Sequence, residues 1–184
     1  MRCCPGMVDP VTPEPTDTAD PAYTERLREL EGRGWKQRLD VQRPYRWNLR
    51  RLHPGRVLDV GCGIGRNLAH LDGNGVGVDH NAASVATARE RGLTAYTAEE
   101  FTACADAVLG GFDSLLVAHV LEHLDLDTQR DLLATYLPYV REGGRVILIT
   151  PQEAGFRTDA THVRFVDAAV CDLALREHGW HVVS

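Results

Sequence analysis

Three glycines at alternating positions are the clearest chemical signal in this sequence. Gly61, Gly63 and Gly65 follow the apolar run at 56–60, and Asp59 stands two residues before the first of them. Glycine lets a backbone turn tightly and approach a ligand closely. A carboxylate beside such a turn suits a ligand with a positive ammonium group better than it suits a pyrophosphate. The pattern therefore predicts a turn that holds a small, partly cationic ligand.

A second carboxylate, Asp79, ends the next apolar run at 76–78. An acid at this place can accept hydrogen bonds from both ribose hydroxyls of a nucleoside. A dinucleotide-binding turn would need its third glycine at position 66, which is Arg66 here. S-adenosylmethionine carries an ammonium, a sulfonium and a ribose, so these residues favour it over a dinucleotide.

Short apolar runs alternate with helical patterns around these residues. The runs predict strands at 56–60, 76–78, 94–96, 112–118 and 145–150, separated by helices at 66–71, 82–91 and 99–109 and by one that Asp127 would cap. This order predicts an α/β, doubly wound, mostly parallel sheet with helices on both faces. Such sheets bind ligands at the carboxyl ends of their strands, where the glycines and Asp79 would lie.

Four motifs in this order resemble the class I S-adenosylmethionine-dependent methyltransferases. They are VLDVGCGIG at 57–65, GVGVDHN at 75–81, FDSLLVAHVLEHL at 112–124 and LPYVREGGRVILITP at 137–151. The resemblance implies a Rossmann-like fold, S-adenosylmethionine as cofactor, and methyl transfer to an acceptor. No large inserted acceptor domain interrupts the motifs, which favours a small-molecule acceptor, and O-, N- and C-methylation all remain open.

The resemblance also implies a set of cofactor-binding residues. They are Asp59, Gly61, Cys62, Gly63, Asp79, His80, Asn81, Thr97, Ala118 and His119. Within this set, Asp79 would hold the ribose hydroxyls, and His80 and Asn81 would flank the adenine. Ala118 and His119 would lie nearest the methyl group. Many relatives have an acid after the third strand for the adenine amine, where this chain has a threonine.

Three histidines are the candidate catalytic residues. His119, His123 and His162 could each accept a proton from a hydroxyl acceptor, because the ordinary pKa of histidine, about 6.5, suits that role. An acceptor that is already nucleophilic needs no base, since methyl transfer from a sulfonium mainly requires positioning. His162 lies in a segment, 161–165, that resembles one bordering the acceptor pocket of many small-molecule methyltransferases. The alternative is a loop histidine that only packs.

Two other interpretations compete for the same residues. His119 to His123 reads HVLEH and matches the HxxEH zinc pattern, but that pattern needs a long helix and here follows a buried strand. We therefore expect no metal. The segment 33–56 has eight basic residues against one acid, with Trp35, Tyr45 and Trp47 interleaved. It predicts a cap over the cofactor with aromatics inward and charges solvated, or alternatively a nucleic-acid contact face.

Composition limits the remaining function classes. The chain has 184 residues, a net charge of -6 and no apolar run near the ~18 residues that span a bilayer. Five scattered cysteines without CxxC spacing favour reduced thiols and a cytoplasmic location. We predict a disordered tail at 1–20, a helical cap at 21–55 and a cofactor-binding domain at 56–184. A sixth strand would begin at Trp180 with no seventh after it, which predicts either a truncated, non-catalytic module or a homodimer.

Overall fold

The computed structural model describes Thr24, residues 42–151, and the stretches 162–163, 165–166, 168–176 and 179–180. The predicted tail at 1–20 and the body of the predicted sixth strand at 181–184 lie outside these residues. In chain order the elements are α3 Arg43–Arg51, β1 Val57–Val60, α4 Arg66–His70, β2 Gly75–Asp79, α5 Ala82–Glu90, β3 Ala95–Thr97, α6 Ala98–Ala103, β4 Phe112–Ala118, η1 Leu121–His123, α7 Leu126–Tyr136, η2 Leu137–Tyr139, β5 Val140–Ile149 and α9 Ala168–Arg176.

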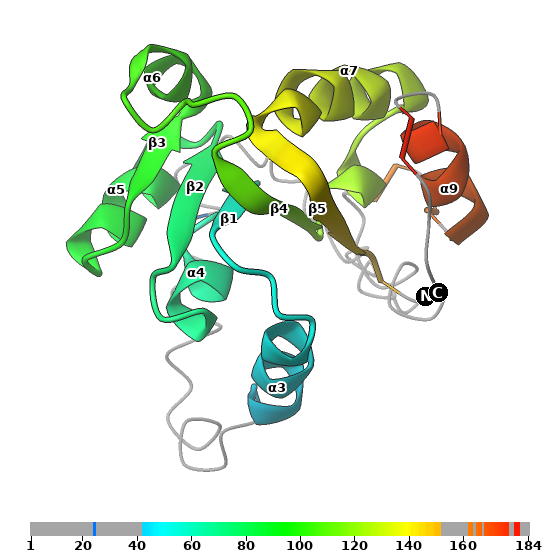
Figure 1. Cartoon of the computed structure of the whole chain (residues 1–184). Helices are drawn as coiled ribbons and strands as arrows, with labels where there is room; N and C mark the ends of the chain where they lie inside the picture. The colour runs from blue at the N-terminus through cyan, green and yellow to red at the C-terminus, as the bar shows by residue number, and fades with distance from the viewer. Residues whose placement is uncertain are drawn as a thin grey trace, which may run out of the picture.

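The five strands form one sheet in the order β3-β2-β1-β4-β5, and every neighbouring pair is parallel (Figure 1). The predicted fold class is confirmed. The chain moves outward from β1 to β2 and β3, and then returns to the other side of β1 for β4 and β5. Because the strand order reverses between β1 and β4, the ligand crevice of such a sheet lies at their carboxyl ends.

Helices cover both faces of the sheet, since neighbouring strand residues point to opposite sides. Leu58 of β1 and Leu115 of β4 are fully buried in a core shared with α6, α7 and α9. Val57 and Leu116, their chain neighbours, are fully buried in a second core with α3 and the end of α4. Each side chain of this size contributes roughly 1.5–3 kcal/mol by leaving water. The two cores therefore fix the strand ends that carry the site.

The predicted helix at 99–109 is shorter in the structure and ends at Ala103. Asp106 accepts a hydrogen bond from the Arg56 guanidinium at 2.7 Å and another from the Tyr96 hydroxyl at 3.0 Å. These contacts hold Asp106 beside Arg56 and Tyr96, in the stretch that follows the end of α6. The prediction was wrong because the partners of Asp106 are distant in sequence.

The cap predicted for α7 was also wrong, by two residues. Asp125, and not Asp127, accepts the hydrogen bond from the Thr128 N–H, at 2.8 Å. An aspartate in this position satisfies one of the free N–H groups at a helix start. Asp127 lies in the first turn and is exposed, 3.5 Å from the guanidinium of Arg130.

The last strand of the described sheet begins earlier than predicted. β5 runs from Val140, and the predicted turn at 143–144 lies inside it as an irregularity, where the pairing with β4 jumps from Val140 to Arg145. Among the helices that the structure describes, none has the length and apolar character needed to cross a membrane.

Candidate functional site

A cavity of about 560 Å³ opens at the carboxyl ends of β1 and β4. Its walls come from the turn after β1, the end of β2, the start of α6, the segment after β4, and side chains of α3 and α7. This volume lies within the range of about 300–1,000 Å³ that is usual for small-ligand sites. The cavity therefore lies where the sheet topology predicts a ligand.

The glycine turn lines one wall of the cavity. The backbone φ angles of Gly61, Gly63 and Gly65 are 76°, 52° and 80°. Residues other than glycine rarely adopt such values. The Gly61 N–H donates to the Val78 carbonyl at 2.8 Å, so the turn is held against the end of β2. A Cβ atom on Gly61 would collide with Val120 after β4. The turn thus needs glycine both for its conformation and for its approach to the opposite wall.

The Asp79 carboxylate joins the glycine turn to the end of β2. It accepts from the Gly63 N–H at 2.7 Å and from the Asn81 N–H at 2.8 Å. The side chain is 7% exposed and lines the cavity. Each carboxylate oxygen can accept more than one hydrogen bond, so Asp79 can also receive hydroxyl donors from a ligand. His80 lines the cavity beside it, with Nδ1 3.6 Å from the carboxylate.

Asp59 lies behind the cavity wall and not on it. It is fully buried, and Asn67 Nδ2 lies 3.5 Å from its Oδ1, while Oδ2 has no hydrogen-bond partner within the described residues. Burial raises the pKa of Asp59 to about 7; the Asn67 bond lowers it and the charge of Asp79 adds to the rise. Asp59 can therefore act on a ligand through Asn67, which lines the cavity.

Asn67 was not predicted from the sequence as a residue of the site, and neither was its hydrogen bond with Tyr45. The Tyr45 hydroxyl donates to Asn67 Oδ1 at 2.9 Å, and both side chains line the cavity. Burial raises the pKa of Tyr45 to about 12, with the charge of Asp59 as the second cause. No local pattern marks Asn67, because its partners lie on another helix and another strand.

Two predicted adenine contacts have other roles in the structure. The Asn81 side chain accepts from the N–H groups of Ala83 and Ser84 and begins α5. Thr97 begins α6 in a reciprocal pair with Glu100. Neither is part of the cavity lining that the structure describes, so their contact with adenine stays a prediction. Cys62 does line the cavity, and burial raises the pKa of its thiol.

The segment after β4 forms the other wall, with Ala118, His119 and His123 in the lining. His119 has a φ of 58°, and its N–H donates to the Ile149 carbonyl at 2.8 Å. The residues that follow make a single turn of 3₁₀ helix, so His119 and His123 are not one helical turn apart on an α-helix. The zinc-peptidase geometry is thus absent from this segment.

His162, the third candidate catalytic histidine, is not part of the described lining. Its ring centroid lies 4.9 Å from that of His123, at an angle of 58°. The structure therefore brings two of the three histidines to the cavity and places the third against one of them.

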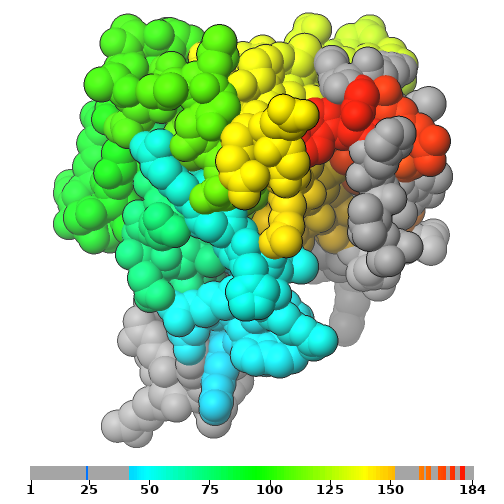
Figure 2. All heavy atoms as spheres, in the orientation of Figure 1, coloured from blue at the N-terminus to red at the C-terminus, as the bar shows by residue number. Residues whose placement is uncertain are grey.

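The basic helix α3 packs beside the cavity in a different way from the predicted cap. Pro44 is in its first turn, where proline is tolerated, and does not break it. Tyr45 points inward, but Trp47 is 58% exposed with the Arg51 guanidinium 5.1 Å from its ring centroid, so the inward prediction for Trp47 was wrong. Figure 2 shows the cyan segment that contains α3 on the lower side of the molecule. Trp35 lies outside the described residues.

Comparison with known protein families shows to which family the chain belongs. Residues 37–184 match the family described as methyltransferase domain. The chain belongs to this family. It is a class I S-adenosylmethionine-dependent methyltransferase, with the parallel Rossmann-like core of that class. A search of the curated proteins found no match.

Solved structures resemble this methyltransferase in fold. A SAM-dependent methyltransferase from Archaeoglobus fulgidus is 21% identical, with a TM-score of 0.63 over 79% of this chain and 72% of that one. A TehB-like SAM-dependent methyltransferase from Corynebacterium glutamicum is 18% identical, with a TM-score of 0.56 over 85% and 83%. DhpI, in a complex with SAM and HEP, is 19% identical, with a TM-score of 0.58 over 87% of each chain.

Proposed function

We propose that this methyltransferase transfers the methyl group of S-adenosylmethionine to a small-molecule acceptor, and that Gly61, Gly63 and Asp79 hold the cofactor. One observation carries the proposal. The Asp79 carboxylate is hydrogen-bonded to the glycine turn and faces the cavity at the point where the sheet order reverses. The turn supplies a close backbone approach, and the carboxylate supplies an acceptor for ribose hydroxyls.

The residues of this chain would mainly position the reactants. When bound, S-adenosylmethionine supplies a methyl group on a sulfonium, which is already activated for in-line displacement. Asp79 would orient the ribose, and the narrow gap between Gly61 and Val120 would exclude water beside it. His119 Nδ1 lies 3.3 Å from Glu122 Oε1, which leaves Nε2 to accept a proton from a hydroxyl acceptor.

A small-molecule acceptor is supported by the size of the cavity and by the charges of α3. The cavity has room for a cofactor and a modest acceptor within one continuous space. Arg50 of α3 pairs with Asp72 at 2.6 Å, and Arg56 after it pairs with Asp106 at 2.7 Å. These two arginines are neutralised within the protein, which favours the cap over the nucleic-acid face. DhpI, which has a similar fold, forms a complex with both SAM and HEP.

Calorimetric titration with S-adenosylmethionine tests the proposal on the wild type, Asp79→Ala and Asp127→Ala. Asp127 is an exposed acid that serves as a matched control. We expect binding to the wild type and to Asp127→Ala, and at least a tenfold weaker affinity, about 1.4 kcal/mol, for Asp79→Ala. Equal affinities in all three would remove Asp79 from the site. Binding of NAD in place of S-adenosylmethionine would overturn the cofactor assignment.

The homodimer stays a prediction, and it is based on the edge of the sheet at β5. Within the described sheet, β5 pairs with β4 on one side. Backbone groups on the other side could pair with a second copy. Light scattering coupled to size-exclusion chromatography would test this, and a monomer mass at micromolar concentration would reject the dimer.

A further inference from the structure

Glu122 poses an electrostatic problem that the proposed methyl transfer does not solve. Its side chain is 1% exposed, and neither carboxylate oxygen has a hydrogen-bond partner in the described part of the chain. Burying an ionised carboxylate without partners is expensive, and native structures rarely leave such a group unsatisfied. His119 Nδ1 approaches Oε1 to 3.3 Å without hydrogen-bond geometry, and its side chain is half exposed. This weak contact does not account for the burial.

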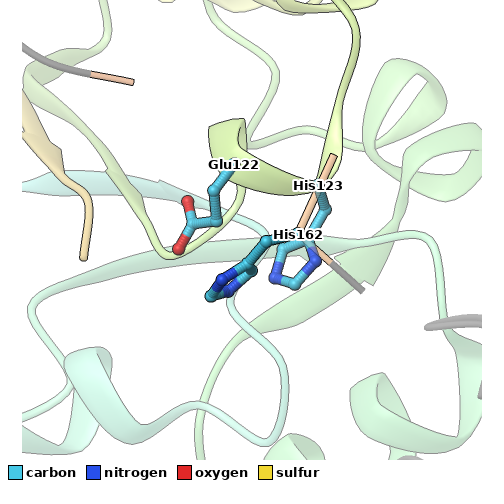
Figure 3. Close-up of side chains that lie close together, drawn as sticks. All are labelled: Glu122, His123 and His162. Carbon is cyan, nitrogen blue, oxygen red and sulfur yellow. The ribbon is translucent and has the colours of Figure 1, made fainter. Parts of the chain in front are cut away.

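Two further ligand-type side chains surround the same carboxylate. One oxygen of Glu122 and one ring nitrogen each of His123 and His162 all lie within 4.8 Å of one another. Figure 3 shows the carboxylate and the two imidazole rings gathered on one side of the η1 turn. The Val163 N–H donates to the Glu122 carbonyl at 2.8 Å, so the segment that carries His162 is tied to this turn by its backbone. The cluster is therefore held from two distant parts of the sequence.

The chemistry of this cluster points to a divalent metal ion. We propose that Glu122, His123 and His162 bind a transition-metal ion of the Zn²⁺ type. Two imidazoles and one carboxylate form the ligand set of catalytic zinc sites and of non-haem iron sites, and both kinds leave coordination positions open. Imidazole favours such ions over Mg²⁺ and Ca²⁺, which take oxygen ligands. A bound cation would supply the partner that the Glu122 carboxylate lacks.

This site differs from the zinc pattern that the sequence displays. In the HVLEH stretch the expected pair of ligands is His119 and His123, but the left-handed backbone at His119 and the 3₁₀ turn after it separate them. His162, 39 residues further along than His123, takes the place of His119 in the cluster. His119, close to Glu122 Oε1, would stay outside the ligand set and keep its proposed role as proton acceptor. The expectation of no metal was based on the local pattern alone.

The position of the cluster also suggests the class of acceptor, and this step rests on the proposed function. His123 lines the cavity beside His119 and Ala118, on the wall opposite the glycine turn. An ion held there would have open positions for an oxygen atom of the acceptor, so the acceptor would carry a hydroxyl group. A metal-bound hydroxyl loses its proton more easily. The proton would pass to His119 Nε2 and from there to water, the O–C bond would form as the C–S bond breaks, and the sulfonium would become a neutral thioether.

Zinc binding by the metal-free full chain tests the site without any methyl-transfer assay. Protein treated with chelator and desalted would compete with a chromophoric chelator for Zn²⁺, as wild type, His162→Asn, Glu122→Gln and the control His53→Asn. His53 is exposed and has a φ of 48°, which asparagine tolerates. We expect one Zn²⁺ bound by the wild type and the control, and at least about tenfold weaker binding by the other two, the order of loss seen when metal-site partners are removed.

Folding and cofactor binding are measured on the same samples. Zn²⁺ should raise the Tm of the wild type and of His53→Asn but not of His162→Asn, since a ligand that binds only the native state stabilises it. If Glu122→Gln does not fold, His162→Asn carries the test. Equal Zn²⁺ affinity in the wild type and His162→Asn, or no Zn²⁺ binding by the wild type, would overturn the metal site. Retained binding of S-adenosylmethionine would then show that the proposed function survives, whereas Zn²⁺ binding without cofactor binding would reject the proposed function alone.

The acceptor class has its own measurement. Co²⁺ in place of Zn²⁺ gives a visible spectrum that responds to the number and type of ligands. Acetohydroxamate, a small oxygen chelator, should change the spectrum of the Co²⁺-loaded wild type if open positions face the cavity. An unchanged spectrum would show a closed structural site and would overturn the assignment of a metal-held hydroxyl acceptor.

Discussion

The two walls of the cavity are built in different ways. On the wall proposed to hold the cofactor, called the cofactor wall, the glycine turn and Asp79 come from two adjacent strands. The Gly63 N–H donates to the Asp79 carboxylate, and the Gly61 N–H donates to the Val78 carbonyl. On the opposite wall, proposed to face the acceptor and called the acceptor wall, His123 comes from a short 3₁₀ turn and packs against His162 from a segment about 40 residues later. The first wall is specified by local backbone conformation and the second by tertiary packing. This difference suggests that the cofactor wall should be the more sensitive to backbone changes and the acceptor wall to side-chain changes.

The largest expected effect comes from the charge behind the cofactor wall. Because the pKa of Asp59 is raised to about 7, the folded state keeps this proton at pH values where the unfolded chain has lost it. Stability therefore falls as the pH rises from about 4 to about 7, and the full cost is present above that. Asp59→Asn removes this cost, and its advantage over the wild type should be about 2–3 kcal/mol larger at pH 8 than at pH 5.

Urea unfolding of both proteins at the two pH values measures this difference. Asp113 provides the control, because its pKa is lowered by the Arg141 side chain and by the Arg56 N–H. Asp113→Asn should not gain stability as the pH rises. A stability difference between wild type and Asp59→Asn that did not change with pH would show that the buried carboxylate is not the source of strain in this wall.

The next effect tests the backbone of the cofactor wall directly. Gly61→Ala places a Cβ against Val120 at a φ of 76°, whereas Gly92→Ala meets a φ of 77° with no atom within 4 Å of its Cβ. Both changes impose the strain of a left-handed residue, roughly 1–2 kcal/mol. Only Gly61→Ala should also move the turn, with a loss of cofactor affinity of at least about tenfold, or 1.4 kcal/mol.

Calorimetric titration with S-adenosylmethionine and thermal unfolding of the two variants separate these contributions. If Gly92→Ala lost as much cofactor affinity as Gly61→Ala, the loss would reflect general destabilisation. The cofactor wall would then not depend on the close approach of Gly61 to the segment after β4.

The sequence predicted the elements whose signals are local. The bounds of β4 at 112–118 match the apolar run, and the turn of Gly61, Gly63 and Gly65 has the left-handed backbone that its glycines predict. Burial on both faces makes such strands continuous apolar runs, and a positive φ selects glycine. The partnership of the turn with Asp79 followed from the topology, since parallel strands end at one edge of the sheet.

The sequence did not predict the contacts that join distant segments. Asp59 bonds to Asn67, which lines the cavity, and nothing in the local pattern pairs these two side chains; the contact of Asp59 with a ligand stays a prediction. Likewise, His162 meets Glu122 and His123 only after the chain has crossed β5. The residue type of each side chain suggested a possible chemical role for that residue alone. Which of these residues share a site is decided by tertiary packing.

A smaller effect tests how firmly α3 holds the cofactor wall. Tyr45→Phe removes the hydrogen bond to Asn67 Oδ1 and should cost about 1 kcal/mol of stability. Tyr139→Phe is the control, because no hydrogen bond of its hydroxyl is found in the described part of the chain and its ring packs on Phe101. The cofactor affinity should fall a few-fold in Tyr45→Phe and stay unchanged in the control. Equal affinities, measured by calorimetry, would make α3 a neighbour of the site and not a part of it.

The smallest expected effect distinguishes the two interpretations of α3. Trp47 is more than half exposed and stacks with Arg51, so Trp47→Ala should change stability by less than about 0.5 kcal/mol and leave cofactor binding unchanged. Fluorescence anisotropy with a labelled single-stranded RNA would check the alternative, because bases stack on exposed aromatics and phosphate contacts weaken with salt. A salt-sensitive affinity in the wild type that Trp47→Ala lowers would favour a nucleic-acid acceptor. In that case α3 would contribute to binding of the acceptor. The acceptor would then contact the outer surface of α3 as well as the acceptor wall of the cavity.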